Sequence, residues 1–338
     1  MATINDVSKR AGVSRSTVSR VIADNGYVSD VKRKAIETAI AELGYRPNTM
    51  ARGLRSNRSN ILGAVVVDVA SPFYAQMVGG MQMVARADGR SVIVQSGFAD
   101  QDQESRAISE LLDRSCDGLI LYLETPMRAD ILDEIARSRI PVVTVGTENC
   151  PVARVRISLD NVAGAQTGMK LLLDEGHRKI VHLSGGPRYR DSLHRLKGIA
   201  AALADIGLGL EDITVISGDF TEHFGLTATR ELIASGQDFT AIFAGDDDIA
   251  AGALLALKEA GIAVPDAVSL LGFDDNFHAR HLTPGLTTIR QPIDEAGRLA
   301  ARYLHAILDG TPPAETSHVI PTELIRRDSV GPAPINRD

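Results

Sequence analysis

The chain has 338 residues, which is long for one ordinary domain, and its 44% hydrophobic and 23% charged residues exclude a disordered protein. The formal net charge of −7 is divided unevenly, because residues 1–60 hold 11 Lys/Arg against 5 Asp/Glu and the remainder holds 25 against 38. A basic head on an acidic body indicates a polyanion partner at one end of the chain only.

The first 45 residues have the pattern of short helices. A break at Gly12 separates two apolar stretches, and Ser14 is a natural N-cap for the second helix. A third helix is expected from about Asp30 to Leu43, with Ser29 as a possible cap and Gly44 as its stop. Apolar residues recur at helical spacing at Ile4, Val7 and Ala11, and again at Val18, Val21 and Ile22.

Residues 3–22 have the layout of a helix-turn-helix. In this motif the outer, N-terminal part of the second helix enters the major groove of DNA. An arginine there can bond both acceptors of a guanine, and a serine can meet a base edge or a phosphate. The alternative is a small helical bundle with a basic surface. We expect DNA contacts from Thr3, Ser14, Arg15, Ser16, Thr17, Ser19 and Arg20.

From residue 61 onward, strand-sized apolar runs alternate with helical segments. Continuous apolar strands separated by helices predict parallel sheets that are covered on both faces. Eight strands exceed one compact sheet, so we expect two α/β lobes that divide near residues 158–160. The chain is expected to cross back near residues 287–292 and to return near 318–322. The predicted strands are 61–68, 91–95, 118–123, 141–146, 179–184, 213–217, 240–244 and 268–273.

The amino-terminal motif continues into a specific resemblance. Residues 41–56 read A-E-L-G-Y-R-P-N-T-M-A-R-G-L-R-S and are soon followed by I-L-G-A-V-V-V. Together with T-I-N-D-V-S-K-R-A-G-V-S-R-S-T-V-S-R-V-I from residue 3, this resembles the LacI/GalR family of bacterial repressors. The resemblance implies a homodimer that binds pseudo-palindromic, double-stranded operator DNA and represses transcription.

The resemblance also implies a hinge helix at about residues 48–55, with DNA contacts from Asn48 and Arg52. Leu54 matches the family's apolar wedge, which enters the minor groove and kinks the duplex. So short a helix, with Gly53 inside it, is not expected to be stable alone and would fold against its twin and the DNA. The alternative for Leu54 is an ordinary contact between linker and core.

The fold class implied is an N-terminal all-α helix-turn-helix head plus hinge helix, followed by a two-lobed α/β effector domain. That domain is periplasmic-binding-protein-like, with doubly wound parallel sheets. The expected domains are a DNA-binding head at 1–46, a hinge and linker at 47–59, an effector-binding and dimerisation domain at 60–330, and a tail at 331–338. Lobe one is expected at 60–158 and 290–318, and lobe two at 159–289 and 319–330.

Sheets of this kind place ligands at the carboxyl ends of their strands, in the cleft between lobes. The motif D-S-L-H-R-L-K-G matches the family's Arg-x-x-Gly at Arg195, and L-L-G-F-D-D-N puts Asp274 at its ligand-binding aspartate. Asp246 stands where the family more often has asparagine. The adjacent Asp247, Asp248 and Asp275 are expected to be helix caps or solvated loop residues. The expected effector site comprises Phe73, Tyr74, Tyr122, Asp191, Arg195, Phe220, Asp246 and Asp274.

An arginine opposite aspartates, with an aromatic ring nearby, suits a polyhydroxylated ligand such as a sugar or sugar derivative. The carboxylate of Asp246 disfavours an anionic ligand, so a neutral sugar is expected rather than a phosphorylated one. A purine remains an alternative because Phe73, Tyr74 and Phe220 can stack on a base. Control by a partner protein also remains open, as does the choice between induction and corepression.

The sequence carries no complete dinucleotide, Walker, zinc-protease or nucleophile-elbow motif, so we expect no enzymatic activity and no cofactor. Cys116 and Cys150 lack metal or redox spacing and are expected to be buried free thiols. His177, at a helix end, is expected to be structural. The start lacks a secretory signal and the apolar runs are too short to span a membrane, which predicts a cytoplasmic protein.

The last residues carry no apolar heptads, which predicts a dimer and no coiled-coil tetramer. The helix at residues 72–88 carries Met77, Met81 and Met83. It is expected to supply either part of the dimer contact or core packing.

Overall fold

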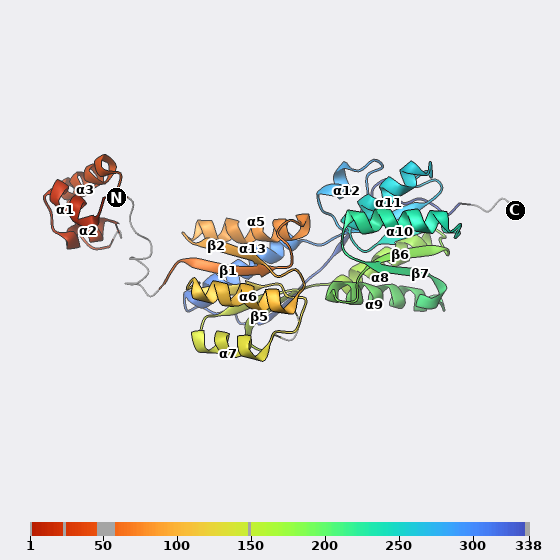
Figure 1. The fold of residues 1–338 in the computed structure, drawn as a ribbon, viewed down its shortest axis with the longest axis horizontal. Coiled ribbons are helices and arrows are strands. Elements are labelled where there is room, and N and C mark those ends of the chain that lie inside the picture. The colour runs from red at the N-terminus through yellow and green to blue at the C-terminus, as the bar shows by residue number, and fades with distance from the viewer. Residues whose placement is uncertain (1, 23–24, 46–57, 148–149, 335–338) are drawn as a thin grey trace. The chain divides into compact units, whose positions relative to one another are not determined.

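The computed structural model describes residues 2–22, 25–45, 58–147 and 150–334. It divides into two compact units, residues 1–59 and residues 60–338. Figure 1 shows the helices of the first unit and the two lobes of the second. Within the described residues, no helix is both long and apolar enough to cross a membrane.

The described residues of the first unit form the helices α1 (Ile4–Ala11), α2 (Arg15–Ile22) and α3 (Asp30–Leu43). Gly12 ends α1 in the left-handed conformation with φ 63°, which a side chain would disfavour. The Ser14 hydroxyl accepts from the Thr17 backbone N–H at 3.2 Å, which confirms the predicted cap of α2. The buried core of this unit consists of Val7, Val18, Val21, Val28, Ile36 and Ala39.

The bounds predicted for the third helix are confirmed. Gly44 adopts the left-handed conformation just after α3 and bonds back to the carbonyls of the last turn. Ser29 stands at the N-cap position in an extended conformation, but its side chain makes no capping hydrogen bond. The start of α3 is therefore not fixed by that hydroxyl.

The first lobe of the second unit is a parallel six-stranded sheet with strand order β11-β5-β4-β3-β1-β2. Helices α5 and α13 cover one face, and α6 and α7 cover the other. Its strands are β1 (Ile61–Val66), β2 (Ser91–Ser96), β3 (Gly118–Leu121), β4 (Val142–Val145), β5 (Ala153–Leu159) and β11 (Ser317–Ile320). Its helices are α5 (Pro72–Ala87), α6 (Gln101–Asp113), α7 (Ala129–Ser138) and α13 (Ile293–Leu308).

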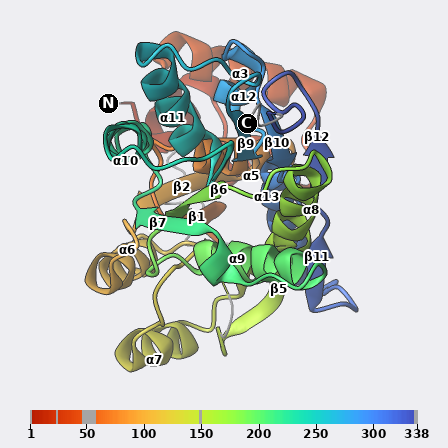
Figure 2. The same ribbon diagram turned by 90° about the vertical axis from the view of Figure 1, so that its right-hand side faces the viewer.

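The second lobe is a six-stranded sheet with order β12-β10-β9-β8-β6-β7, in which only the β10–β12 pair is antiparallel. In Figure 2, α8 and α9 lie on one side of this sheet and α10 and α11 on the other. Its strands are β6 (Ile180–Gly185), β7 (Thr214–Gly218), β8 (Ala241–Ala244), β9 (Ser269–Asp274), β10 (Thr287–Arg290) and β12 (Glu323–Ile325). Its helices are α8 (Asn161–Asp174), α9 (Arg190–Ala204), the short 3-10 helix η1 (Leu210–Asp212), α10 (Glu222–Ala234), α11 (Asp247–Glu259) and α12 (Phe277–His281).

All eight predicted strands are present, with ends within two residues of those expected. Strand β5 was not predicted, because its burial alternates and Arg154 and Arg156 interrupt its apolar residues. Strand β10 was predicted only as a crossing, but it pairs with β9 in the second sheet. The chain therefore crosses to the first lobe after Arg290, between β10 and α13. Strand β11 extends the first lobe to Ile320, past the predicted residue 318.

Several side chains that the sequence analysis singled out lie in the core. Met77 and Met81 on α5 are fully buried, whereas Met83 is exposed. His177 is fully buried and bonds Thr240 through Nδ1 at 2.9 Å and Ser269 through Nε2 at 3.0 Å, which confirms its structural role. Cys116 and Cys150 are both free and buried, as expected.

The close packing of α9 on α8 yields a first prediction. A Cβ atom at Gly198 of α9 would lie 2.1 Å from the Val162 carbonyl oxygen, so alanine must force the two helices apart. We expect Gly198→Ala to lower the free energy of unfolding by about 1–3 kcal/mol, measured by urea denaturation. Gly79→Ala is the matched control, because a Cβ atom at this position of α5 would meet no atom within 4 Å, and it should not destabilise the protein. Equal stabilities of the two variants would contradict this account of the packing.

Candidate functional site

The first unit presents a polar face at the start of α2. Arg15, Ser16 and Arg20 are exposed on this helix, and Ser19 is half-buried. Val18 and Val21 point into the core, so the amphipathic pattern of α2 directs Arg15 and Arg20 away from it. This is the face that the sequence analysis expected to meet base edges.

The other candidates of the head have local structural roles. The Thr3 hydroxyl accepts from the Asp6 N–H in a capping box at the start of α1. The Ser14 hydroxyl lies 2.8 Å from the hydroxyls of both Ser16 and Thr17. Backbone caps of this kind fix the orientation of the helix starts. Asn48, Arg52 and Leu54 lie outside the described residues.

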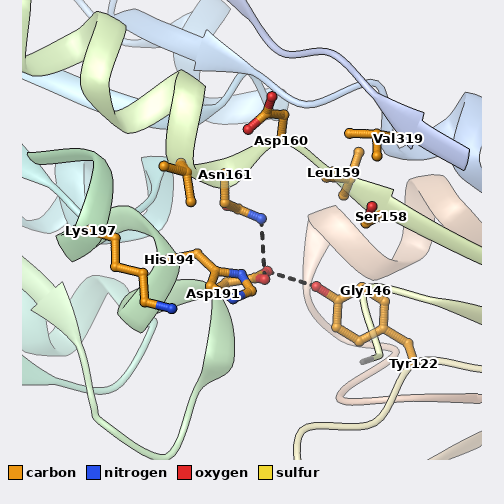
Figure 3. A pocket seen from close by; sticks show the side chains of 11 residues that line it. Tyr122, Gly146, Ser158, Leu159, Asp160, Asn161, Asp191, His194, Lys197 and Val319 are labelled. Atoms are coloured by element: carbon orange, nitrogen blue, oxygen red, sulfur yellow. Dashed lines mark hydrogen bonds between the residues drawn. The ribbon is translucent and has the colours of Figure 1, made fainter. Parts of the chain in front are cut away.

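The candidate effector site lies where the two lobes of the second unit meet. Tyr122 follows β3 in the first lobe, and its hydroxyl donates to Asp191 Oδ2 of α9 at 2.7 Å. Asn161, at the start of α8, donates through Nδ2 to the other oxygen of Asp191 at 3.2 Å. Figure 3 shows both hydrogen bonds converging on this carboxylate. Asp191 therefore links the lobes directly.

Arg195, one turn after Asp191 on α9, is a buried cation. Its Nε donates to Asn161 Oδ1 at 2.8 Å, and its Nη2 lies 3.3 Å from Asp274 Oδ1 and 3.9 Å from Asp191 Oδ2. Its Nη1 donates to the Gly245 carbonyl. The guanidinium therefore lies between two carboxylates, which offset the cost of burying it.

Aromatic rings surround this cation on the second lobe. The guanidinium carbon of Arg195 lies 4.0 Å from the ring centroid of Phe273 and 5.4 Å from that of Phe220. Phe220 in turn packs against Tyr189 with ring centroids 5.0 Å apart. Phe220 was predicted in the site, whereas Phe273 was not, because its position within β9 looked like ordinary core.

Three rings of the first lobe form the opposite wall. Tyr74 packs edge-to-face on Phe73 and on Tyr122, with centroid separations of 5.1 Å in both pairs. Burial raises the pKa of Tyr74 well above its ordinary value, and the charges of Asp191 and Asp274 raise it further. The Tyr74 hydroxyl therefore stays protonated and can donate a hydrogen bond in this site.

Asp274 ends β9 with φ 111°, a conformation that residues other than glycine rarely adopt. Such strain costs of order 1–3 kcal/mol and concentrates at functional sites. Gln291 donates through Nε2 to Asp274 Oδ1 at 2.7 Å. Burial raises the pKa of Asp274 to about 7, although Arg195 opposes that shift.

Asp246 caps helix α11, because its Oδ1 accepts from the Ile249 N–H at 2.7 Å. It is also buried in the same cluster, where burial and the charges of Asp248 and Asp274 raise its pKa well above the ordinary value. This carboxylate therefore combines a capping role with a place in the candidate site.

The expectation for two neighbouring acids was wrong. Asp247 is neither a cap nor solvated, since it is fully buried and accepts from the Thr288 hydroxyl and the Asn276 N–H. Asp275 is buried as well and pairs with Arg290 at 2.8 Å and Arg327 at 2.6 Å. These carboxylates brace the loops beneath the site, which an adjacent run of aspartates in the sequence does not reveal.

Sequence reasoning missed three polar residues of the site, Asn161, Gln291 and Glu124. The first two lie directly in the segments that connect the lobes, and that position could have signalled them. Glu124 Oε2 accepts from the Arg190 N–H of the second lobe at 2.8 Å. Burial raises the pKa of Glu124 to about 8. The loop that carries it is held by Glu104, which accepts from the Glu124 N–H at 2.9 Å.

A cavity of about 260 Å³ adjoins this cluster. Tyr122, Asn161 and Asp191 line it together with His194 and Lys197 of α9, as Figure 3 shows. Arg195, Asp246 and Asp274 do not line the cavity. Asp191 and Asn161 contact both regions, so they connect the open cavity to the buried cation.

Comparison with known proteins accounts for both units. Residues 3–48 match the family described as bacterial regulatory proteins, lacI family, and residues 169–330 match a periplasmic binding protein-like domain. The transcriptional regulator GalR of Salmonella typhimurium (strain SL1344) is 36% identical over 98% of this chain and 96% of its own length. This chain belongs to the lacI family of bacterial regulatory proteins.

Other members of the lacI family extend the comparison. The repressor PurR of Erwinia tasmaniensis is 32% identical over 99% of this chain and 98% of its own. A solved lac repressor dimer bound to operator and an anti-inducer has a TM-score of 0.86 at 26% identity, covering 98% of this chain and 99% of that one. The predicted fold class is confirmed by these matches. The relatives are transcription regulators and not enzymes, so this lacI-family chain is a DNA-binding regulator.

Proposed function

We propose that this regulator is a homodimeric repressor whose affinity for a pseudo-palindromic operator is controlled by a sugar-type ligand bound between its two lobes. The single observation that carries the ligand site is the buried guanidinium of Arg195 between Asp191 and Asp274, at the junction of both lobes. Carboxylates accept from vicinal hydroxyls and the guanidinium donates to ring or hydroxyl oxygens. A solved relative, CelR, is 30% identical over 97% of this chain and is described in complex with cellobiose.

The proposal assigns the eight predicted residues to the two walls of the ligand site. Phe73, Tyr74 and Tyr122 cover the ligand from the first lobe, and the remaining five bind it from the second. A ligand that contacts both walls favours closure, because it gains contacts only in the closed state. Closure changes the placement of the two hinges of the dimer and couples the ligand to DNA by about 1–3 kcal/mol.

On the DNA side, the proposal assigns base contacts to α2 and minor-groove contacts to the hinge at 47–59, including Asn48, Arg52 and Leu54. A head with one short recognition helix offers few contacts, so two heads are needed for tight binding. Operator affinity should also fall steeply as the salt concentration rises, because the contacts to DNA phosphates release counterions.

One experiment tests the proposal as a whole. A panel of sugars and purines is titrated into the complex of the intact protein with operator fragments selected from a random library, followed by fluorescence anisotropy. We expect a sugar to release or tighten the complex at least several-fold. A response to purines alone would reassign the ligand. A protein that selects no sequence from the library would defeat the DNA-binding part of the proposal.

Asp274→Ala is expected to abolish the ligand response and to leave unliganded operator affinity within about twofold. The carboxylate bonds Arg195 and Gln291 in the cleft, and the described head residues lie in another unit. The measurement is operator affinity with and without ligand. Asp266→Ala, which removes an exposed carboxylate of the same lobe, is the control and should respond like the parent protein. A retained response in Asp274→Ala would move the ligand site elsewhere.

Arg20→Ala is expected to relax base preference within each half-site, at a cost of about 1–3 kcal/mol in specific binding. Its exposed guanidinium lies on the face of α2 that the core leaves free. The measurement is selection of binding sites from a random library. Arg10→Ala is the control, because Arg10 pairs with Glu42 on another face of the head. An unchanged preference in Arg20→Ala would exclude a base contact from this residue.

A further inference from the structure

Building on the proposed function of the cleft, we infer that its ligand carries a protonated amine in addition to hydroxyl groups, as an amino sugar does. This inference rests on the surroundings of Arg195. Several buried carboxyl groups lie around this one enclosed guanidinium, and oxygen atoms beside it have no hydrogen-bond partner among the described residues. The sequence analysis predicted a neutral sugar, and this inference replaces that expectation.

The cleft holds more buried carboxyl groups than cations. Asp191, Asp246 and Asp274 are all buried around Arg195, the one cation that the described residues enclose among them. Glu124 adds a fourth buried carboxylate, which accepts from the Arg190 backbone and feels the charge of its side chain. Four carboxyl groups therefore face two arginines, and burial raises the pKa of Glu124, Asp246 and Asp274, which favours their protonated forms until another cation binds.

The adjoining cavity does not supply an excess of cations over carboxyl groups. His194 and Lys197 line it, and Lys197 is exposed, but Asp160 lines it too. In Figure 3, Asp160 stands on the far side of Asn161 from the two basic side chains. The cavity that contains the Lys197 cation is thus lined by two carboxyl groups, those of Asp160 and Asp191.

Oxygen atoms without a hydrogen-bond partner remain beside these carboxyl groups. Asp246 Oδ1 is taken by the Ile249 N–H, and Asp274 Oδ1 by Arg195 and Gln291. Among the described residues, no hydrogen bond reaches the second oxygen of Asp246 or of Asp274. The amide oxygen of Gln291, a residue only 3% exposed, is likewise buried with no partner.

An ammonium group carries three donors and no acceptor, which complements these three oxygens. A hydroxyl would satisfy one of them but would leave the neighbouring carboxyls without a further cation in the closed cleft, whereas an ammonium supplies the charge that lets them ionise and bind it by charge-assisted hydrogen bonds. Asp246 is one of these carboxyls, and it is a position at which this chain departs from the family, which more often has asparagine there.

The test measures binding of D-glucosamine, D-galactosamine and D-mannosamine to the intact protein by isothermal titration calorimetry. Each amine is compared with its parent hexose and its N-acetyl derivative, which keep the ring but lack the charge. We expect at least one amine to bind about tenfold or more tightly than both of its neutral counterparts. Asp246→Asn should bring the three affinities of that series within about threefold of one another.

Asp266→Asn makes the same change of charge at an exposed position of the same lobe and should keep the preference for the amine. Thermal unfolding of both variants checks that the fold is retained. If a neutral hexose binds as tightly as its amine, or an acidic sugar binds better, this inference is overturned while the proposed sugar response stands. If no member of the series binds while a purine releases the operator, both the inference and the sugar assignment fail.

Discussion

Replacing Arg195 by methionine is expected to lower the free energy of unfolding by about 3–5 kcal/mol at about pH 8. Methionine approximates the length of the arginine stem, so the loss reports the missing charge. Without the guanidinium, Asp191 and Asp274 would be buried without their cation. The measurement is urea denaturation of the intact protein, with the ligand response recorded in parallel and expected to be lost.

The same variant should be less destabilised at about pH 6. Burial holds the pKa of Asp274 at about 7, so its carboxyl is largely protonated there and no longer needs the cation. Arg188→Met is the matched control, because Arg188 pairs with Asp219 while both side chains remain about half exposed. An exposed pair of this kind contributes little, so its loss should be under about 1 kcal/mol at either pH. Similar losses in the two variants would show that Arg195 is not the centre of a buried charge cluster.

The fold was predictable wherever burial left a simple trace in the sequence. Strands buried on both faces appear as continuous apolar runs, the Ser14 hydroxyl caps the start of α2, and α3 ends at Gly44. Strand β5 escaped because half of its side chains, including Arg154 and Arg156, avoid the core. A strand of that kind has no run of apolar residues to detect, and only its pairing with β4 and β11 in the folded sheet defines it.

The candidate site was predictable where chemistry and position coincided. Arg195 and Asp274 stood in recognisable motifs, Arg195 on the helix that follows β6 and Asp274 at the end of β9, and the structure brings them within 3.3 Å of each other. Asn161 and Gln291 were not foreseen although they lie in or beside the segments predicted to connect the lobes, because the sequence does not show which side chains of such a segment bond Asp191, Arg195 or Asp274. Asp247 looked no different from Asp246 in the sequence, yet Asp247 turns beneath the loop to bond Thr288. Which of two adjacent aspartates lies in the candidate site is decided by the helix start, where Asp246 is the N-cap and Asp247 the first residue of α11, and not by residue type.

The contacts between lobes suggest how the site responds to its ligand. Tyr122 and Glu124 of the first lobe bond Asp191 and the Arg190 backbone of the second. These bonds connect the two walls through groups that a ligand would also contact. A ligand can therefore strengthen or replace them, and the difference between those outcomes would distinguish corepression from induction.

The second large effect expected is a loss of stability of the unliganded protein by about 2–3 kcal/mol as the pH rises from about 6.5 to about 8.5. Burial raises the pKa of Glu124 to about 8 and that of Asp274 to about 7, whereas both carboxyls titrate near 4 in the unfolded chain. At a pH above the unfolded pKa and below the folded pKa of a carboxyl, the folded state holds more protons than the unfolded state, so the free energy of unfolding falls as the pH rises. Each group contributes about 1.4 kcal/mol per pH unit until its folded pKa is passed.

We choose about pH 6.5 as the lower limit of this pH range because, below it, the titration of His182 makes stability rise with pH and opposes the effect of the two carboxyls. Burial lowers the pKa of His182 to about 4, so its contribution is lost as the pH falls from its unfolded value of about 6.5. Glu124→Gln should reduce the slope between about pH 7.5 and pH 8.5, because Asp274, with a pKa of about 7, is mostly ionised there while the wild-type Glu124 still titrates. Glu134→Gln on α7 is the control and should leave the slope unchanged. A wild-type stability that stays flat or rises across this window would show that the carboxyls of the cleft are ionised in the folded state, since only their retained protons give the slope its sign.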